Sequence, residues 1–323
     1  MDKRNNHGGL VSFEPTVALN KWGFTAKSWD SRIYPPFFHP DRISELVQKW
    51  EPDMRDIFIC THQKVGTHLT KKFVVELLRN YKFHPPEHGI SLSDIGHGTV
   101  PWPEVFVSQY GSEAFNDQLN DNVDVPRLWY THCSLDDLPF KATSKGPKFL
   151  HVFRDPRGVV VSQYHFYRSH PMLGVSSELD LESFIDLFLE GKLYFGDYFE
   201  HTVQWLKRGM AELGAENVLS LRYEDLVDSK IESVKRISNF LFPHLELSDE
   251  SAAMIVEATE FNRMKKEITE NPQTFHFNPE KFFREGKSFG WMESLTKDQQ
   301  SRICSVAKEK WKGIRTNYEF EIV

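Results

Sequence analysis

The chain has 323 residues, of which 40% are hydrophobic and 26% are charged, values that are ordinary for a soluble globular protein. Its formal net charge of -7 argues against a nucleic-acid-binding protein, because such proteins are usually basic. Three widely spaced cysteines, Cys60, Cys133 and Cys304, give no disulfide framework and no paired metal motif. They favour a reducing compartment, and we expect a cytoplasmic protein without a signal peptide or a membrane span.

Residues 1–55 are predicted to be an N-terminal lead-in that packs on the domain formed by residues 56–323. The lead-in is expected to be a loop with one short helix near residues 42–50. It is rich in aromatic residues, among them Trp22, Trp29, Tyr34, Phe37 and Phe38. These side chains either pack onto the domain or line one wall of a substrate cleft.

A strand, a glycine turn and a helix are predicted in succession between residues 56 and 81. The apolar run from Ile57 to Cys60 is typical of a buried strand, and the residues after Gly66 repeat with the period of a helix. Because the first N–H groups of a helix are unpaired and its dipole is positive there, this arrangement suits a phosphate group. Lys64 adds a positive charge and Thr67 a hydroxyl. From this stretch alone, an ordinary turn with a surface lysine is an equally good interpretation.

Strands and helices alternate along the rest of the chain. Residues 82–124 contain several prolines and are predicted to be a long irregular connection, and residues 271–290 a loop. The other predicted strands span 127–131, 148–154 and 218–222, and the predicted helices 156–166, 181–189, 198–213, 229–242, 249–259 and 296–311. This alternation predicts an α/β fold, a single domain with a central parallel sheet flanked by helices.

Two further positions at predicted strand ends are candidates for binding or catalysis. Arg154 ends a strand beside the helix start marked by Asp155, and it is well placed for a phosphate together with Ser162 on that helix. An ion pair between Arg154 and Asp155 is the alternative. His132 lies just past strand 127–131, at the edge where open α/β sheets bind ligands, and its pKa suits proton transfer. A structural or exposed histidine is the alternative there.

These motifs follow the order found in the cytosolic sulfotransferases, and the chain resembles that family from about Asp56 to Trp291. The resemblance implies a P-loop-like turn that holds the phosphosulfate of 3′-phosphoadenosine 5′-phosphosulfate (PAPS). It implies Lys64 and His132 as catalytic residues, with His132 as the base. The implied nucleotide-binding residues are Lys64, Val65, Gly66, Thr67, His68, Leu69, Arg154, Ser162, Tyr223, Thr259, Phe261, Arg284, Glu285 and Gly286.

Within that set, the resemblance also implies separate roles. Arg154, Ser162 and Arg284 would bind the 3′-phosphate, Tyr223 would lie beside the nucleotide, and Thr259 and Phe261 would lie near the adenine.

Several positions depart from the family's pattern. Val65 stands where the family usually has serine, and Leu69 replaces a tryptophan that stacks on adenine. His68 replaces a second threonine, and Glu285 replaces a lysine of the late turn. Tyr130 stands where many members have a lysine in the catalytic site. We therefore expect donor binding to be retained and the packing around the adenine to be altered.

The resemblance implies transfer of the sulfuryl group of PAPS to a hydroxyl, less favourably an amine, of a small-molecule acceptor. The product nucleotide would be 3′-phosphoadenosine 5′-phosphate (PAP), and no metal would be needed. Phenols, alcohols, sterols and specialised metabolites such as alkaloids are all open as acceptors. Besides that acceptor we expect no nucleic-acid or membrane partner, and either a monomer or a homodimer.

Two alternative functions stay open. A P-loop-like nucleotide kinase is disfavoured because Lys64 precedes Gly66, whereas a Walker A lysine follows the second glycine directly. A nucleotide-binding member without transfer activity is disfavoured because both Lys64 and His132 are present.

Overall fold

The structure, a computed structural model, describes residues 21–24, 26–29, 32–83, 101–119, 126–138, 146–170, 173, 175–270, 286–318 and 320. The strands are β1 (Lys27–Trp29), β2 (Arg32–Tyr34), β3 (Asp56–Thr61), β4 (Arg127–Thr131), β5 (Lys148–Phe153) and β6 (Val218–Arg222). The helices of the first half are α2 (Pro40–Lys49), α3 (Thr67–Asn80), α4 (Pro103–Tyr110), α5 (Ser112–Leu119), the 3-10 turn η1 (Leu135–Asp137) and α6 (Pro156–Ser169). Those of the second half are α7 (Leu181–Leu189), α8 (Tyr198–Val203), the π-helical η3 (Gln204–Gly209), α9 (Met210–Leu213), α10 (Tyr223–Asp228), α11 (Lys230–Leu241), α12 (Asp249–Ala258), α13 (Phe261–Glu270) and α15 (Lys297–Lys310).

Strands β3 to β6 form one parallel sheet in the order β4-β3-β5-β6. In the register, Cys60 lies opposite Thr131, Thr61 opposite Val152, and Phe153 opposite Arg222. All four strands therefore end at one edge of the sheet. The predicted α/β fold with a central parallel sheet is confirmed.

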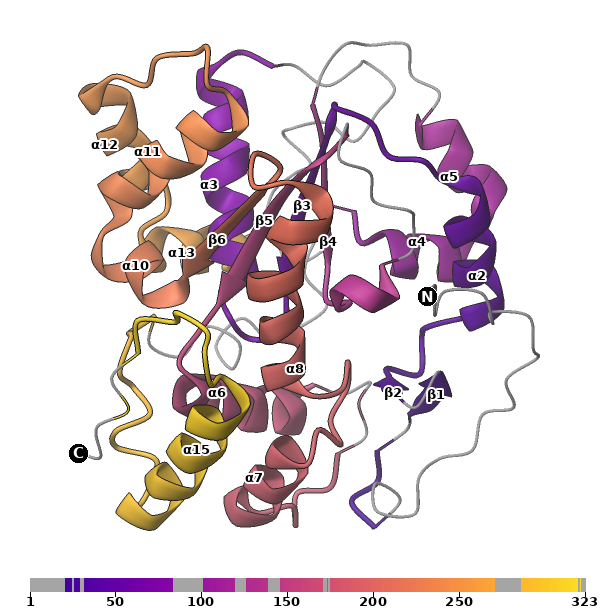
Figure 1. The fold of residues 1–323 in the computed structure, drawn as a ribbon, viewed down its shortest axis with the longest axis vertical. Helices are drawn as coiled ribbons and strands as arrows, with labels where there is room; N and C mark the ends of the chain where they lie inside the picture. The colour runs from indigo at the N-terminus through magenta and orange to yellow at the C-terminus, as the bar shows by residue number, and fades with distance from the viewer. Residues whose placement is uncertain are drawn as a thin grey trace.

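Helices cover both faces of the sheet. Helices α3 and α10 to α13 lie on one side, and α2, α4 and α5 lie on the other (Figure 1). Along β3, Ile57 and Ile59 belong to the larger hydrophobic core, whereas Phe58 and Cys60 belong to a second core together with Trp50, the residue that follows α2. This two-sided burial explains why β3 is an unbroken apolar run, as is usual for a parallel strand.

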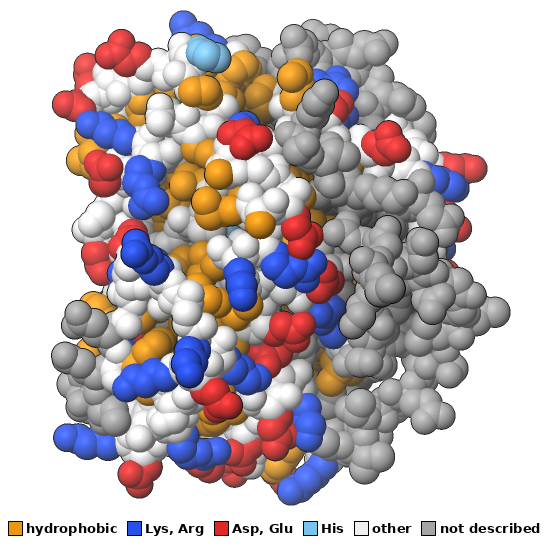
Figure 2. Space-filling model, viewed as in Figure 1, with side chains coloured by type: hydrophobic (Ala, Val, Ile, Leu, Met, Phe, Trp, Pro, Cys, Tyr) orange, Lys and Arg blue, Asp and Glu red, His pale blue; other side chains and the backbone are white. Residues whose placement is uncertain are grey.

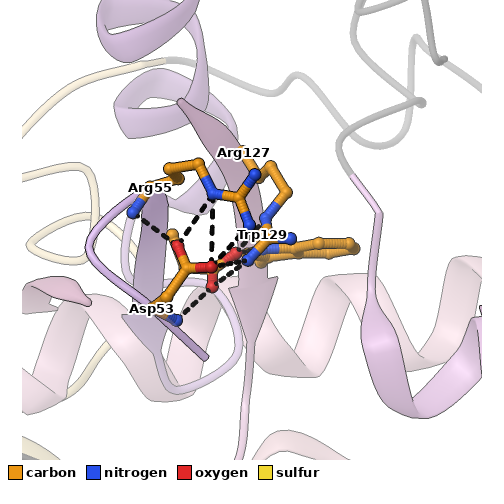
Figure 3. Close-up of polar contacts among 5 residues, drawn as sticks. Asp53, Arg55, Arg127 and Trp129 are labelled. Carbon is orange, nitrogen blue, oxygen red and sulfur yellow. Dashed lines mark hydrogen bonds and ion pairs between the residues drawn. The ribbon is translucent and has the colours of Figure 1, made fainter. Parts of the chain in front are cut away.

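A buried ion pair joins β3 and β4 at their amino ends (Figure 3). The carboxylate of Asp56 is completely buried and accepts hydrogen bonds from Arg127 Nη2 at 2.6 Å and Trp129 Nε1 at 2.7 Å. Asp53 accepts from Arg55 Nη2 at 2.6 Å beside this pair. The network fixes the register of β3 and β4 at their amino ends. The candidate site residues lie at the other, carboxyl ends.

The lead-in differs in part from the prediction. Residues 27–34 contain the antiparallel strands β1 and β2, where a loop was expected, while the predicted short helix is present as α2. The backbone N–H of Phe195 donates to Ile33 O at 2.7 Å, which ties β2 to the segment before α8. The division of the chain at residue 55 stays a prediction.

Other departures concern helices. The predicted irregular connection over 82–124 was wrong for residues 103–119, which form α4 and α5. The helix predicted over 198–213 is interrupted by the π-helical segment η3, and α13 was not predicted at all. Of the helices described, none is long and apolar enough to span a bilayer.

Candidate active site

The shared edge of the sheet gathers the site residues predicted from separate stretches of sequence. The loop 62–66 follows β3, His132 follows β4, Arg154 follows β5, and Tyr223 follows β6. Given the strand order β4-β3-β5-β6, His132 and Arg154 lie on opposite sides of the loop. Ligands of open α/β sheets bind at such an edge.

The loop after β3 has a backbone that only its glycine allows. Gly66 is the N-cap of α3 with φ 113°, and a Cβ placed there would lie 2.7 Å from Cδ2 of Tyr223. No side chain caps this helix start, and its first turn has no acidic residue. Thr67 begins the helix, and its hydroxyl lies 2.8 Å from that of Thr61. The N–H groups and the dipole of α3 are thus directed at the edge of the sheet, as an anion requires.

Arg154 is held by groups that do not neutralise it. Its Nη1 donates to Lys64 O at 3.2 Å and its Nη2 to Lys287 O at 3.3 Å, and the guanidinium lies 4.0 Å from the centroid of the Tyr223 ring. Asp155 pairs with Arg157 instead, at 2.6 Å, so the alternative of an Arg154–Asp155 ion pair is not what forms. In the part of the chain that the structure describes, no carboxylate forms an ion pair with Arg154, and its buried Nε has no hydrogen-bond partner.

Helix α6 supports this guanidinium. A Cβ on Gly158 would lie 2.8 Å from Arg154 Nε, so a glycine at 158 lets the arginine rest on the helix. Ser162 lies four residues further along, on the same helix face, and is partly exposed. The structure therefore brings Arg154 and Ser162 to one helix face, beside the loop that carries Lys64.

The structure describes both residues predicted to lie near the adenine, and one residue of the late turn. Thr259 ends α12, where its hydroxyl donates to Val256 O at 2.8 Å, and Phe261 begins α13. A Cβ on Gly286 would overlap the ring of Phe261, so Gly286 packs closely on α13. Arg284 and Glu285 lie outside the described residues.

His132 is fixed in one tautomer. Its Nδ1 donates to Thr61 O at 2.8 Å, which leaves Nε2 as the acceptor. Burial, together with the nearby charges of Lys71 and Lys64, lowers the pKa of His132 to about 3. The ring is therefore neutral near pH 7, with a lone pair on Nε2 that can take a proton.

The comparisons with known proteins decide the family. A model of the sulfotransferase domain matches residues 54–315, most of the chain. The chain belongs to the sulfotransferase family. The family predicted from the motifs is thus confirmed.

Individual relatives and structures agree with this assignment. The sulfotransferase is 35% identical over 199 residues to sulfotransferase 6B1 of Danio rerio, an alignment that spans 60% of this chain and 63% of the relative. It is 28% identical to cytosolic sulfotransferase 1 of Danio rerio over 292 residues, 87% of this chain and 92% of the relative. The crystal structure of mouse sulfotransferase SULT7A1 complexed with PAP shares the fold, with a TM-score of 0.70 at 22% identity over 89% of this chain and 94% of that one.

In this sulfotransferase, aromatic side chains surround His132. Its ring centroid lies 4.9 Å from that of Trp102, 5.3 Å from Phe195 and 5.6 Å from Tyr130. Phe38 of the lead-in packs behind Trp102, at 5.3 Å. Phe38 is buried, so it fits the first of the two interpretations of the lead-in aromatics, packing onto the domain. Trp102 and Phe195 were missed, since they come from connections that carry no motif.

The structure shows the burial and contacts of four positions that depart from the family's pattern. Val65 is fully buried in the larger core, Leu69 is half-buried against that core, and His68 is partly exposed. Tyr130 lies under a lysine that the sequence analysis did not single out, because the Lys71 Nζ is 4.3 Å from its ring centroid. The roles of Val65, His68 and Leu69 in nucleotide binding stay predictions.

The surface around the sheet carries charges of both signs. On the face shown in Figure 2, lysine and arginine side chains alternate with aspartates and glutamates, and hydrophobic side chains appear between them. Within the described ranges, no three His, Cys, Asp or Glu side chains lie together as metal ligands would.

Proposed function

We propose that this sulfotransferase transfers the sulfuryl group of PAPS to a hydroxyl of a small aromatic acceptor. One observation carries the proposal: a neutral histidine, an uncapped helix start and an arginine that no described carboxylate pairs with meet at one edge of the sheet. The first of these is suited to an acceptor proton and the other two to the phosphate groups of a nucleotide.

The residues present fit the nucleotide. A side chain at Gly66 or Gly158 would fill the space beside Tyr223 or Arg154, and Arg154 Nε is buried without a partner. The amides of Gly66 and Thr67 would hold the 5′-phosphate. Arg154 and Ser162 would hold the 3′-phosphate, with Arg284 as a further proposed ligand. When bound, PAPS supplies an activated sulfuryl group.

Two side chains would carry the transfer. His132 Nε2 takes the proton of the acceptor hydroxyl as the oxygen of that hydroxyl bonds to sulfur. Lys64 would donate a hydrogen bond to the leaving phosphate oxygen, and its charge would stabilise the negative charge that develops there. Lys64 has φ 66° and belongs to the same loop as Gly66, which places its side chain on the edge of the sheet. Its ammonium lies 4.8 Å from the Phe166 ring centroid in this structure.

The acceptor would lie against the aromatic side chains around His132. Trp102 and Tyr130 are partly exposed beside His132 and offer ring surfaces to a planar molecule, and the buried Phe195 packs against His132. A phenol fits this wall. A cationic alkaloid fits it less well because the ammonium of Lys71 lies against the Tyr130 ring.

The test is an assay of the purified protein with PAPS and a panel of phenols, aliphatic alcohols, sterols and alkaloids. We expect a product heavier by one SO₃ group, together with one PAP for each product molecule. ATP in place of PAPS tests the kinase alternative. Tight binding of PAP without any product across the panel would favour a member that binds nucleotide but does not transfer.

A further inference from the structure

Two adjacent lysines of α3 are buried, and among the described residues only Lys72 pairs with carboxylates. Lys72 is 8% exposed, and its Nζ pairs with Glu76 at 3.0 Å and Glu267 at 2.8 Å. Lys71 is 5% exposed, and no carboxylate in the described ranges forms an ion pair with it. Its ammonium lies over the face of the Tyr130 ring, 4.3 Å from the ring centroid.

A buried ammonium without a carboxylate partner destabilises the folded protein. Transfer of a charge out of water is expensive unless a partner compensates it, and a single aromatic ring compensates only part. Burial accordingly lowers the pKa of Lys71 to about 7. A bound anion would supply the missing partner and hold the lysine in its charged form.

The position of Lys71 places its charge at the reacting centre. Lys71 lies in the second turn of α3, and helix side chains lean toward the helix start, which here follows the loop of Lys64 and Gly66. The Tyr130 ring that it covers is itself 5.6 Å from the His132 ring. The charge of Lys71 also contributes to the lowered pKa of His132.

We propose that Lys71 is an anion-binding residue of the active site, which pairs with a negatively charged group bound between the start of α3 and His132. This inference rests on the proposed function. Two sources offer that chemistry: the phosphosulfate end of the donor, and an acidic group on the acceptor. Either source gives Lys71 a direct part in binding and makes it a determinant of specificity.

The test compares Lys71→Met with the wild type by calorimetry. The nucleotide arm measures the affinities of PAPS and PAP. The acceptor arm measures binding of 4-hydroxyphenylacetate and of 4-methylphenol, two phenols that differ in one carboxylate, to the PAP complex. We expect about a 10–100-fold loss of affinity in the arm that contains the anion, since a hydrogen bond to a charged group is of that strength. Lys71→Arg should recover part of the loss.

The two arms identify the source. Weaker binding of PAPS or PAP assigns the donor, and weaker binding of 4-hydroxyphenylacetate with 4-methylphenol unaffected assigns the acceptor. The ligand-free Lys71→Met protein should melt at the wild-type temperature or above it, because an unpaired buried charge is removed.

Lys72→Met is the matched control. It lies on the same helix and is similarly buried, but its partners are the protein's own carboxylates, so its affinities should stay at wild-type values. Unchanged affinities in both arms for Lys71→Met would overturn the inference, as would a lower melting temperature without any loss of affinity. Failure of the wild type itself to bind PAP would instead count against the proposed function.

Discussion

At the scale of single residues, His132 and Arg154 have different surroundings, which suit them to different roles. Thr61 O accepts from Nδ1 of His132 and so fixes a neutral ring with its lone pair on Nε2. Arg154 is held by backbone carbonyls and the Tyr223 ring, while the carboxylate of Asp155 pairs with Arg157. The first arrangement suits proton transfer and the second suits phosphate binding.

Lys64→Ala should lower the turnover number by about 10²–10³-fold, since removal of one positioned charge-stabilising donor has that effect. The melting temperature should change little because Lys64 is a partly exposed loop residue. Steady-state rates with PAPS and a working acceptor check this, with Lys49→Ala, an exposed lysine of α2, as the control. Turnover near the wild-type value would remove Lys64 from the catalytic role.

Arg154→Gln should reduce the preference for PAP over adenosine 5′-phosphate, which lacks the 3′-phosphate. We expect PAP affinity to fall by about 10–100-fold and that of adenosine 5′-phosphate to fall far less. Calorimetry with both nucleotides measures the two affinities. An equal loss for both would mean that Arg154 supports the loop through Lys64 O and does not recognise the 3′-phosphate.

At the scale of elements, the sequence predicted those whose local signals agree with their packing. The apolar run of β3 and the helical period of α3 correspond to the buried positions of these elements. Asp155 caps α6, with Pro156 in its first turn, as expected. Helix α4 was missed because Pro103 was interpreted as a sign of a loop, although proline suits the first turn of a helix.

The parts of the candidate site that were missed depend on contacts between distant elements. Phe195 has φ 69° and faces His132 because its N–H is held by Ile33 O, and no local pattern encodes such a contact. In the sequence, Lys71 is one of two adjacent helix lysines. Only the contacts between elements show that Lys72 pairs with a carboxylate, whereas Lys71 lies over the Tyr130 ring of β4.

Gly66→Ala tests whether the backbone conformation of the loop after β3 is needed for stability and nucleotide binding. The residue has φ 113°, and an added Cβ would meet the Tyr223 ring at 2.7 Å, so the backbone or the ring must move. We expect a loss of about 1–3 kcal/mol in the free energy of unfolding, together with a marked loss of PAP affinity. Urea denaturation and calorimetry measure these two quantities. The control is Gly313→Ala, which also has positive φ but no atom within 4 Å of an added Cβ, and it should retain PAP affinity.

At the scale of the whole molecule, three histidines lie in the interior beside the sheet. His62, His151 and His201 are each at most 2% exposed, and the ring of His201 lies 5.4 Å from that of His62 and 5.9 Å from that of His151. Burial lowers the pKa of all three, to about 4 for His62 and about 3 for His151. Each ring is therefore neutral in the folded protein at pH 7.

These rings predict acid sensitivity. Above pH 6.5 they are neutral in both states, whereas between pH 6.5 and about 4 they gain protons only in the unfolded chain, so stability falls as the pH falls. At pH 5 the loss is about 2 kcal/mol for each ring, a large part of a typical stability of about 5–15 kcal/mol. Urea denaturation at pH 7.0, 6.0 and 5.0 measures it. Constant stability over this range would contradict the burial of neutral histidines.

We propose that the donor site and the base come from different strand ends and act separately. The most direct measurement is PAP affinity and single-turnover transfer in His132→Ala. We predict PAP affinity close to that of the wild type, and transfer slower by about 10²–10⁴-fold, the usual contribution of a general base. Lost PAP binding with transfer at the wild-type rate under saturating PAPS would contradict the account, because His132 would then belong to the nucleotide site.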